Sequence, residues 1–141
     1  MTDTAFVAMA IPGNADPLLT AGVLNVQYRR VECKYPGVAV SFGVGSGSSP
    51  YYFETLIEYV NGDGSLSAVE LKQASASSLD SWLSMQQSWG AVWKLNDTSG
   101  LTAPFSLKLI EDSGKTLVAD NVIPADWQPG NTYQSAVTSF V

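Results

Sequence analysis

Short runs in which apolar and polar residues alternate, each closed by a turn motif, fill most of the sequence after residue 22. The clearest run is 52–59, where one side carries Phe53, Thr55, Ile57 and Tyr59. The other side carries Tyr52, Glu54, Leu56 and Glu58. Successive side chains of a β-strand point to opposite faces, so the pattern predicts a half-buried strand whose first set faces a core.

The same pattern recurs along the chain and predicts an all-β domain. In the run 38–44 it places Val38, Val40, Phe42 and Val44 inward, and in the run 66–72 it places Val69 and Leu71 on one face. The expected strands are 23–33, 38–44, 52–59, 66–72, 91–95, 104–110, 115–120 and 132–137, with a short strand or turn at 82–85 and a polar loop at 73–81. The turn motifs "NGDG" at 61–64 and "EDSG" at 111–114 predict hairpins between the strands that flank them. Seven or eight short strands with frequent turns are typical of an antiparallel β-sandwich of two sheets.

The first 22 residues have a different character. Pro12, Gly13, Pro17 and Gly22 interrupt them and leave short helical pieces at 5–10 and 16–21. We therefore expect an irregular linker over residues 1–22 and the sandwich over 23–141. The apolar stretch 5–11 lacks a basic region before it, so we do not interpret it as a signal peptide, and an exported protein would need its signal outside this chain.

Composition limits the function classes. The 141 residues, 45% hydrophobic and 14% charged, suit one globular domain. A net charge of −6, with no basic cluster larger than Arg29–Arg30, disfavours nucleic-acid and anionic-lipid partners. No apolar run approaches the roughly 18–20 residues needed to cross a bilayer.

Catalysis and metal binding find little support. The chain has no histidine, and its only cysteine is Cys33, so a Ser-His-Asp triad, an internal disulfide and a Cys/His metal site are all excluded. The acidic residues fall on expected wet faces and in turns rather than as a glycosidase pair across a cleft. We expect no enzyme activity, no cofactor and no metal, and we expect Cys33 to act as a small hydrophobe.

The aromatic residues are more informative, because four Trp and six Tyr are many for a chain with so few charges. Trp82 and Trp93 are expected in the core, and Trp127 is expected to plug one end of the sandwich. Trp89 precedes Gly90 outside the expected strand and either folds inward or is exposed. Tyr51 and Tyr52 either cover a sheet edge or form a surface that stacks against a planar apolar ligand such as a sugar ring.

Several segments, taken in order, resemble a known family. They are "NVQYRRVECKYPG", "YVNGDGSLSAVELK", "QQSWGAVWKL", "LTAPFSLKL" and "NVIPADWQPGNTYQS". The chain resembles the second domain of the plant β-expansins and the related group 2 and group 3 grass-pollen allergens. The opening stretch looks like the tail of the first expansin domain and its linker.

The resemblance implies an immunoglobulin-like β-sandwich that binds plant cell-wall polysaccharide, cellulose or arabinoxylan, without hydrolysing it. It assigns the binding platform to Tyr51, Tyr52 and Trp89, with Ser49, Glu54, Lys72 and Gln87 as polar neighbours. It implies a secreted, extracellular, monomeric protein of the plant cell wall that supports wall loosening. In β-expansins the cysteine corresponding to Cys33 pairs with one in the first domain, which is missing here.

Two alternatives stay open beside the polysaccharide module. The sandwich could be a protein-interaction or structural domain, like a pollen allergen that has lost sugar binding. It could also be a weak glycoside hydrolase, for which the sequence gives no carboxylate pair. Separately, Asn96-Asp97-Thr98 has the pattern of an N-glycosylation acceptor, usable only in the secretory route.

Overall fold

The computed structural model describes residues 3–74 and 82–141 and forms two compact units, Met1–Arg30 and Val31–Val141. The first unit holds helices α1 (Asp3–Val7) and α2 (Ala15–Ala21), which overlap the expected helical pieces. Neither of these helices, nor any other within the described ranges, is long and apolar enough to span a membrane. The division into a linker at 1–22 and a sandwich from 23 onward stays a prediction.

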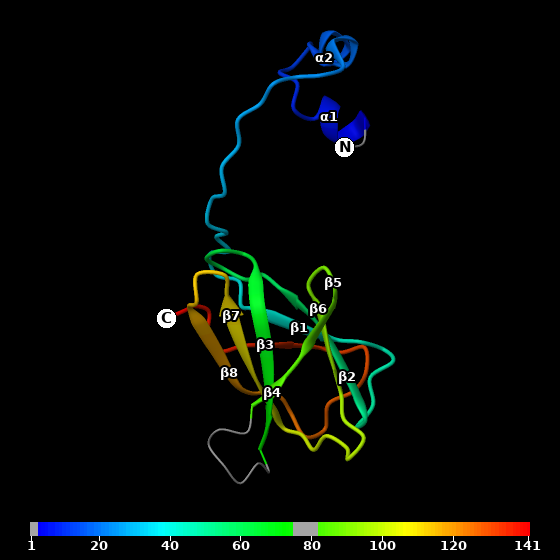
Figure 1. Cartoon of the computed structure of the whole chain (residues 1–141), viewed down its shortest axis with the longest axis vertical. Coiled ribbons are helices and arrows are strands. Elements are labelled where there is room, and N and C mark those ends of the chain that lie inside the picture. The colour runs from blue at the N-terminus through cyan, green and yellow to red at the C-terminus, as the bar shows by residue number, and fades with distance from the viewer. Residues whose placement is uncertain (1–2, 75–81) are drawn as a thin grey trace. The chain divides into compact units, whose positions relative to one another are not determined.

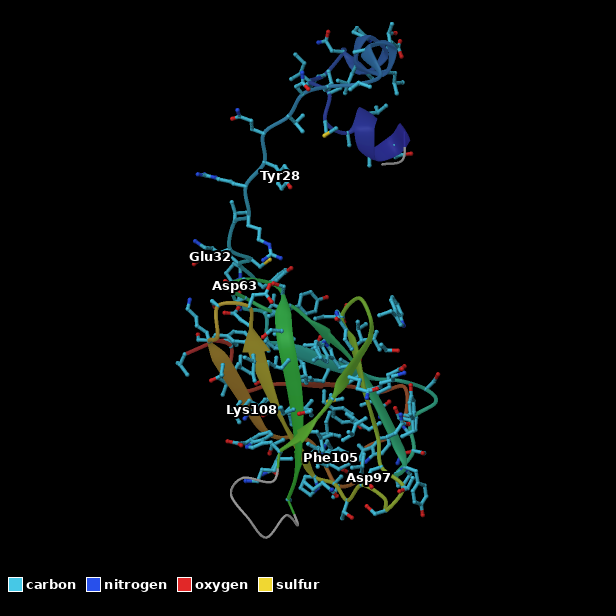
Figure 2. The ribbon with its side chains drawn as sticks, in the orientation of Figure 1. Tyr28, Glu32, Asp63, Asp97, Phe105 and Lys108 are labelled. Atoms are coloured by element: carbon cyan, nitrogen blue, oxygen red, sulfur yellow. The ribbon has the colours of Figure 1, made fainter. Side chains whose placement is uncertain are left out.

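The strand expected over 23–33 is wrong. Residues 23–32 form no strand, and Cys33 makes only an isolated bridge with Gly62. Alternation gives a strand only where another strand completes the hydrogen-bond ladder. Among the residues that the structure describes, no strand pairs with residues 23–32, and Tyr28 within them (labelled in Figure 2) is 96% exposed. Cys33 is half-buried rather than buried, with its thiol free and beside Gly64.

The second unit is a sandwich of two antiparallel sheets, which confirms the predicted fold class (Figure 1). Its strands are β1 (Ser41–Val44), β2 (Tyr52–Glu58), β3 (Leu66–Gln73), β4 (Leu83–Ser84), β5 (Gln86–Trp89), β6 (Val92–Asn96), β7 (Phe105–Glu111), β8 (Thr116–Ile123) and β9 (Thr132–Gln134). One sheet has the order β5-β6-β2-β1-β9 and the other β4-β3-β7-β8. β5 was not expected as a strand, and most of the polar loop expected at 73–81 lies outside the described residues.

The core lies between the sheets and follows the predicted alternation. Phe53 and Ile57 on β2 and Leu71 on β3 are buried, as is Trp93 on β6. Trp127 packs edge-on against Phe53, with ring centroids 5.8 Å apart, as the expected plug should. The ring centroids of Phe105 on β7 (labelled in Figure 2) and Phe53 lie 5.2 Å apart, and the ring planes meet at 69°, so an edge-to-face contact joins the two sheets.

Three residues expected in the core lie outside it. Tyr59 is 44% exposed because its φ of 61° breaks the alternation where β2 ends, and its ring packs against Tyr35 instead. Val38 lies before β1 begins and is also exposed. Trp82 is half-buried, with its ring beneath the ammonium group of Lys108 at 4.8 Å.

The hairpin predicted at "NGDG" is also wrong. β2 pairs with β1 and β6, whereas β3 pairs with β4 and β7, so residues 61–64 carry the chain from one sheet to the other. The buried carboxylate of Glu111 accepts a hydrogen bond from the Asp63 backbone N–H at 2.8 Å and fixes this crossing. The hairpin predicted at "EDSG" is confirmed by the pairing of β7 with β8.

Replacing Phe105 by alanine should lower the free energy of unfolding by about 3–5 kcal/mol, because it removes a fully buried ring that contacts Phe53 and Trp127. Urea unfolding followed by tryptophan fluorescence measures the change. Val31→Ala, at a position 69% exposed, is the control and should stay within about 0.5 kcal/mol of the parent. A cost for Phe105→Ala below about 1 kcal/mol would contradict this packing.

Candidate functional site

The outer face of the five-stranded sheet carries the candidate site, and register defines its members. On β2 and β6, Tyr52 lies opposite Asn96, Glu54 opposite Lys94, and Leu56 opposite Val92. Residues directly opposite in an antiparallel pair share a face. Since Phe53 and Trp93 between them point inward, these three pairs lie on the outer face, where Val92 is nevertheless buried.

A β-bulge decides the position of Trp89. Gln87 lies opposite Trp93, but the register shifts after it, so that Trp89 lies opposite Val92. Without the extra residue, Trp89 would have the inward parity of Gln87. The bulge therefore turns the indole outward, where it is 71% exposed, and this answers the question that the sequence left open.

The other two predicted platform residues lie at the opposite end of the face. Tyr52 begins β2 and is half-buried, whereas Tyr51, just before the strand, is 62% exposed. The register places Trp89 four residues along the strands and two strands across from Tyr52. At typical strand dimensions this is about 13 Å along and about 10 Å across, so Trp89 and Tyr52 lie at two ends of a diagonal on one face.

Polar side chains lie between the aromatic ends. Gln86, Lys94 and Glu54 form a row across β5, β6 and β2. Glu54 folds over Gly45, where a Cβ would come within 2.9 Å of its Oε1, so the absence of a side chain at Gly45 gives the carboxylate room. The face thus offers a carboxylate, an ammonium and an amide to hydroxyl-bearing ligands.

Glu54 also holds Tyr52. The Tyr52 hydroxyl donates a hydrogen bond to Oε2 of Glu54 at 2.6 Å. This bond, followed by partial desolvation and the carboxylate charge, raises the pKa of Tyr52 above its ordinary value, because ionisation would remove the donor and set two negative charges side by side.

The loop before β2 and the turn after β6 hold Tyr51. Its backbone N–H donates to Ser49 Oγ at 3.2 Å, and its carbonyl accepts from the Asp97 N–H at 3.1 Å. Ser99 donates to the Asp97 carboxylate through both its hydroxyl and its N–H, which lowers the pKa of Asp97 and closes the turn.

The structure separates the polar neighbours expected from the sequence. Ser49 and Glu54 lie beside the tyrosines, and Gln87 donates to the carbonyl of Gly90 in its own hairpin. The prediction that Lys72 lies near the platform is wrong, because Lys72 is on β3 in the other sheet, over the ring of Trp82. Lys94 was missed, although it follows the core residue Trp93 and so had to point outward.

No cluster of three or more His, Cys, Asp or Glu side chains that could hold a metal occurs in residues 3–74 and 82–141. A cavity of about 710 Å³ lies instead near the crossing at Asn61–Gly62, lined also by Tyr35, Lys115 and Phe140. The buried Glu111 on its wall is already used to fix the crossing. The outer face of the five-stranded sheet, which carries Tyr52 and Trp89 and is called the aromatic face below, is therefore the better candidate for ligand binding.

The structure is a module of the two-sheet antiparallel β-sandwich class. One of its sheets exposes aromatic and polar side chains. Residues 40–124 match the family model described as the expansin C-terminal domain. The chain belongs to this family, which confirms the resemblance read from the sequence.

Its relatives include plant β-expansins. Expansin-B11 of Oryza sativa subsp. japonica is 55% identical over 139 residues, covering 97% of this chain and 46% of that protein. Putative expansin-B2 of Arabidopsis thaliana is 54% identical over 138 residues, covering 97% and 50%. The chain therefore spans about half the length of the curated relatives it matches.

Solved structures share the fold. An apo expansin of Clavibacter michiganensis matches with a TM-score of 0.54 and 19% identity, covering 72% of this chain and 45% of that one. A mutant of the same expansin in complex with cellohexaose matches with a TM-score of 0.55 and 19% identity, covering 79% and 48%.

Replacing Glu54 by alanine should lower the pKa of Tyr52 toward its ordinary value of about 10, because the hydrogen bond and the neighbouring charge are both lost. Ultraviolet difference titration measures this, with Tyr52→Phe identifying the Tyr52 signal. Because the folded pKa is raised, Tyr52 contributes stability that is fully present below about pH 10 and is lost as the pH rises through the folded value. The Glu54→Ala variant should therefore show a weaker alkaline loss of stability.

Glu58→Ala is the matched control for this titration, since Glu58 is an exposed acid on the same face of β2. It should leave the Tyr52 transition unchanged. An equal shift in both variants would show that general charge, rather than the specific hydrogen bond, sets this pKa.

Proposed function

We propose that this chain is a non-catalytic module that binds plant cell-wall polysaccharide, cellulose or arabinoxylan, through Tyr51, Tyr52 and Trp89. The observation that carries the proposal is the outward Trp89 indole on the face that also presents Tyr52. Membership of the expansin family supports it, as does the shared fold of a bacterial expansin whose structure contains cellohexaose.

The chemistry of the face suits a sugar chain. Pyranose rings present C–H groups on their flat sides, and aromatic rings offer an apolar, polarisable surface to them. The row formed by Gln86, Lys94 and Glu54 can exchange hydrogen bonds with equatorial hydroxyls between the aromatic ends. The ligand would lie along the diagonal and contact both ends.

The two carboxylates beside the platform tyrosines have roles other than catalysis. Glu54 accepts the Tyr52 hydroxyl, and Asp97 accepts both donors of Ser99. A glycosidase needs one carboxyl group as a proton donor and a second as nucleophile or base at a set separation. We therefore propose binding without hydrolysis, in a secreted, monomeric protein of the plant cell wall, in support of wall loosening.

Tyr52→Ala and Trp89→Ala should each weaken binding to insoluble cellulose and arabinoxylan by about 1 kcal/mol, or about fivefold in dissociation constant, because each removes one stacking ring. Depletion isotherms with the purified chain measure the effect. The double variant should lose about the product of the two factors, because the rings lie at separate ends of the face.

Tyr28→Ala is the matched control, since Tyr28 is 96% exposed but lies outside the sandwich. It should bind like the parent chain. Retention of full binding by the double variant would remove the proposed platform, and absence of binding to any glycan by the parent would favour a structural or protein-interaction domain.

A further inference from the structure

The acceptor pattern Asn96-Asp97-Thr98 lies at the edge of the proposed binding face. Asn96 is the last residue of β6, and both Asn96 and Thr98 are exposed. An N-linked acceptor needs an accessible asparagine followed at two positions by Ser or Thr, with no proline between. The segment meets this requirement in the folded chain.

Asn96 is the direct cross-strand partner of Tyr52. Directly opposite residues have Cβ atoms about 4.5–5.5 Å apart and point to the same side of the sheet. Any group attached to the Asn96 amide therefore starts beside the Tyr52 ring, on the face that the polysaccharide would use.

The turn that follows Asn96 lies against the second tyrosine. A Cβ at Gly100 would be 3.4 Å from Cε1 of Tyr51, so the Tyr51 ring packs on this turn. The Asp97 N–H is bonded to the Tyr51 carbonyl. A bulky group on Asn96 therefore has both platform tyrosines as neighbours. Tyr52 lies beside it on the adjacent strand, and Tyr51 lies against the turn that follows it.

We propose that an N-linked glycan on Asn96 covers Tyr51 and Tyr52, so that glycosylation and polysaccharide binding compete. The competition rests on the proposed function. In the secretory route, a lipid-diphosphate-linked oligosaccharide supplies the sugar. A bond forms between Asn96 Nδ2 and the anomeric carbon, the amide loses one proton, and the lipid diphosphate leaves.

The test uses the full chain secreted from plant cells and separated by lectin chromatography into modified and unmodified fractions. Intact mass should show a glycan that Thr98→Ala abolishes while Asn96 is kept. The modified fraction should bind cellulose about fivefold more weakly than the unmodified fraction, as expected when the stacking of about one ring is lost. Enzymatic removal of the glycan should restore binding.

A relocated glycan is the matched control. Gly114→Asn creates an acceptor with Lys115 and Thr116 in the β7–β8 turn, where φ is +85°, which asparagine tolerates, and nothing lies within 4 Å of the added Cβ. That turn is bonded to Asp63, and Figure 2 shows Asp63 and Asp97 at opposite ends of the sandwich. Combined with Thr98→Ala, it should give a glycosylated chain that binds like the unmodified one.

Hydroxyl-radical footprinting tests the covering without any polysaccharide. Oxidation of Tyr51 and Tyr52 should fall in the modified fraction, with Tyr28 as the unchanged reference. Absence of a glycan on Asn96, or a glycan that alters neither footprint nor binding, would overturn the inference. Protected tyrosines with no polysaccharide retention by either fraction would instead overturn the proposed function, and with it the competition.

Discussion

The register of the antiparallel ladders is the constraint on which the candidate site depends. In a strand, a shift of one residue moves every following side chain to the other face. One extra residue between Gln87 and Trp89 therefore decides which face of the sheet carries the indole. Because β5 is the edge strand of its sheet, the bulge disturbs only the ladder to β6, and the core around Trp93 is kept.

Features that depend on local pattern were predictable from the sequence, and features that depend on partners were not. Alternation identified the inward residues of β2 and β3, and the "EDSG" motif identified the β7–β8 hairpin, because both follow from residues close in the chain. The strand expected over 23–33 failed because alternation says nothing of whether another strand is present to pair. The outward turn of Trp89 was left open for the same reason, since a bulge is defined only against the partner strand.

The turn at 61–64 shows a second limit of local reasoning. Gly62 and Gly64 both have positive φ, as the motif suggested, yet the turn leads to the other sheet. The difference comes from Glu111, nearly fifty residues further along, whose buried carboxylate binds the backbone of Asp63. Lys72, which the resemblance gave as a polar neighbour of the platform, lies on the other sheet from Tyr52 because β3 pairs with β4 and β7.

The form of the site bears on the kind of ligand it suits. An enclosed pocket buries most of a small molecule, whereas the aromatic face has its rings at two ends of a sheet with polar groups between them. A monosaccharide could reach one end at a time, but a chain can contact both ends and gain from each. The sheet, the Glu54–Tyr52 hydrogen bond and the Asp97 turn hold these groups before any ligand arrives, so that little ordering cost falls on binding. Weak individual contacts on a preorganised, open face therefore favour an extended polymer over a free sugar.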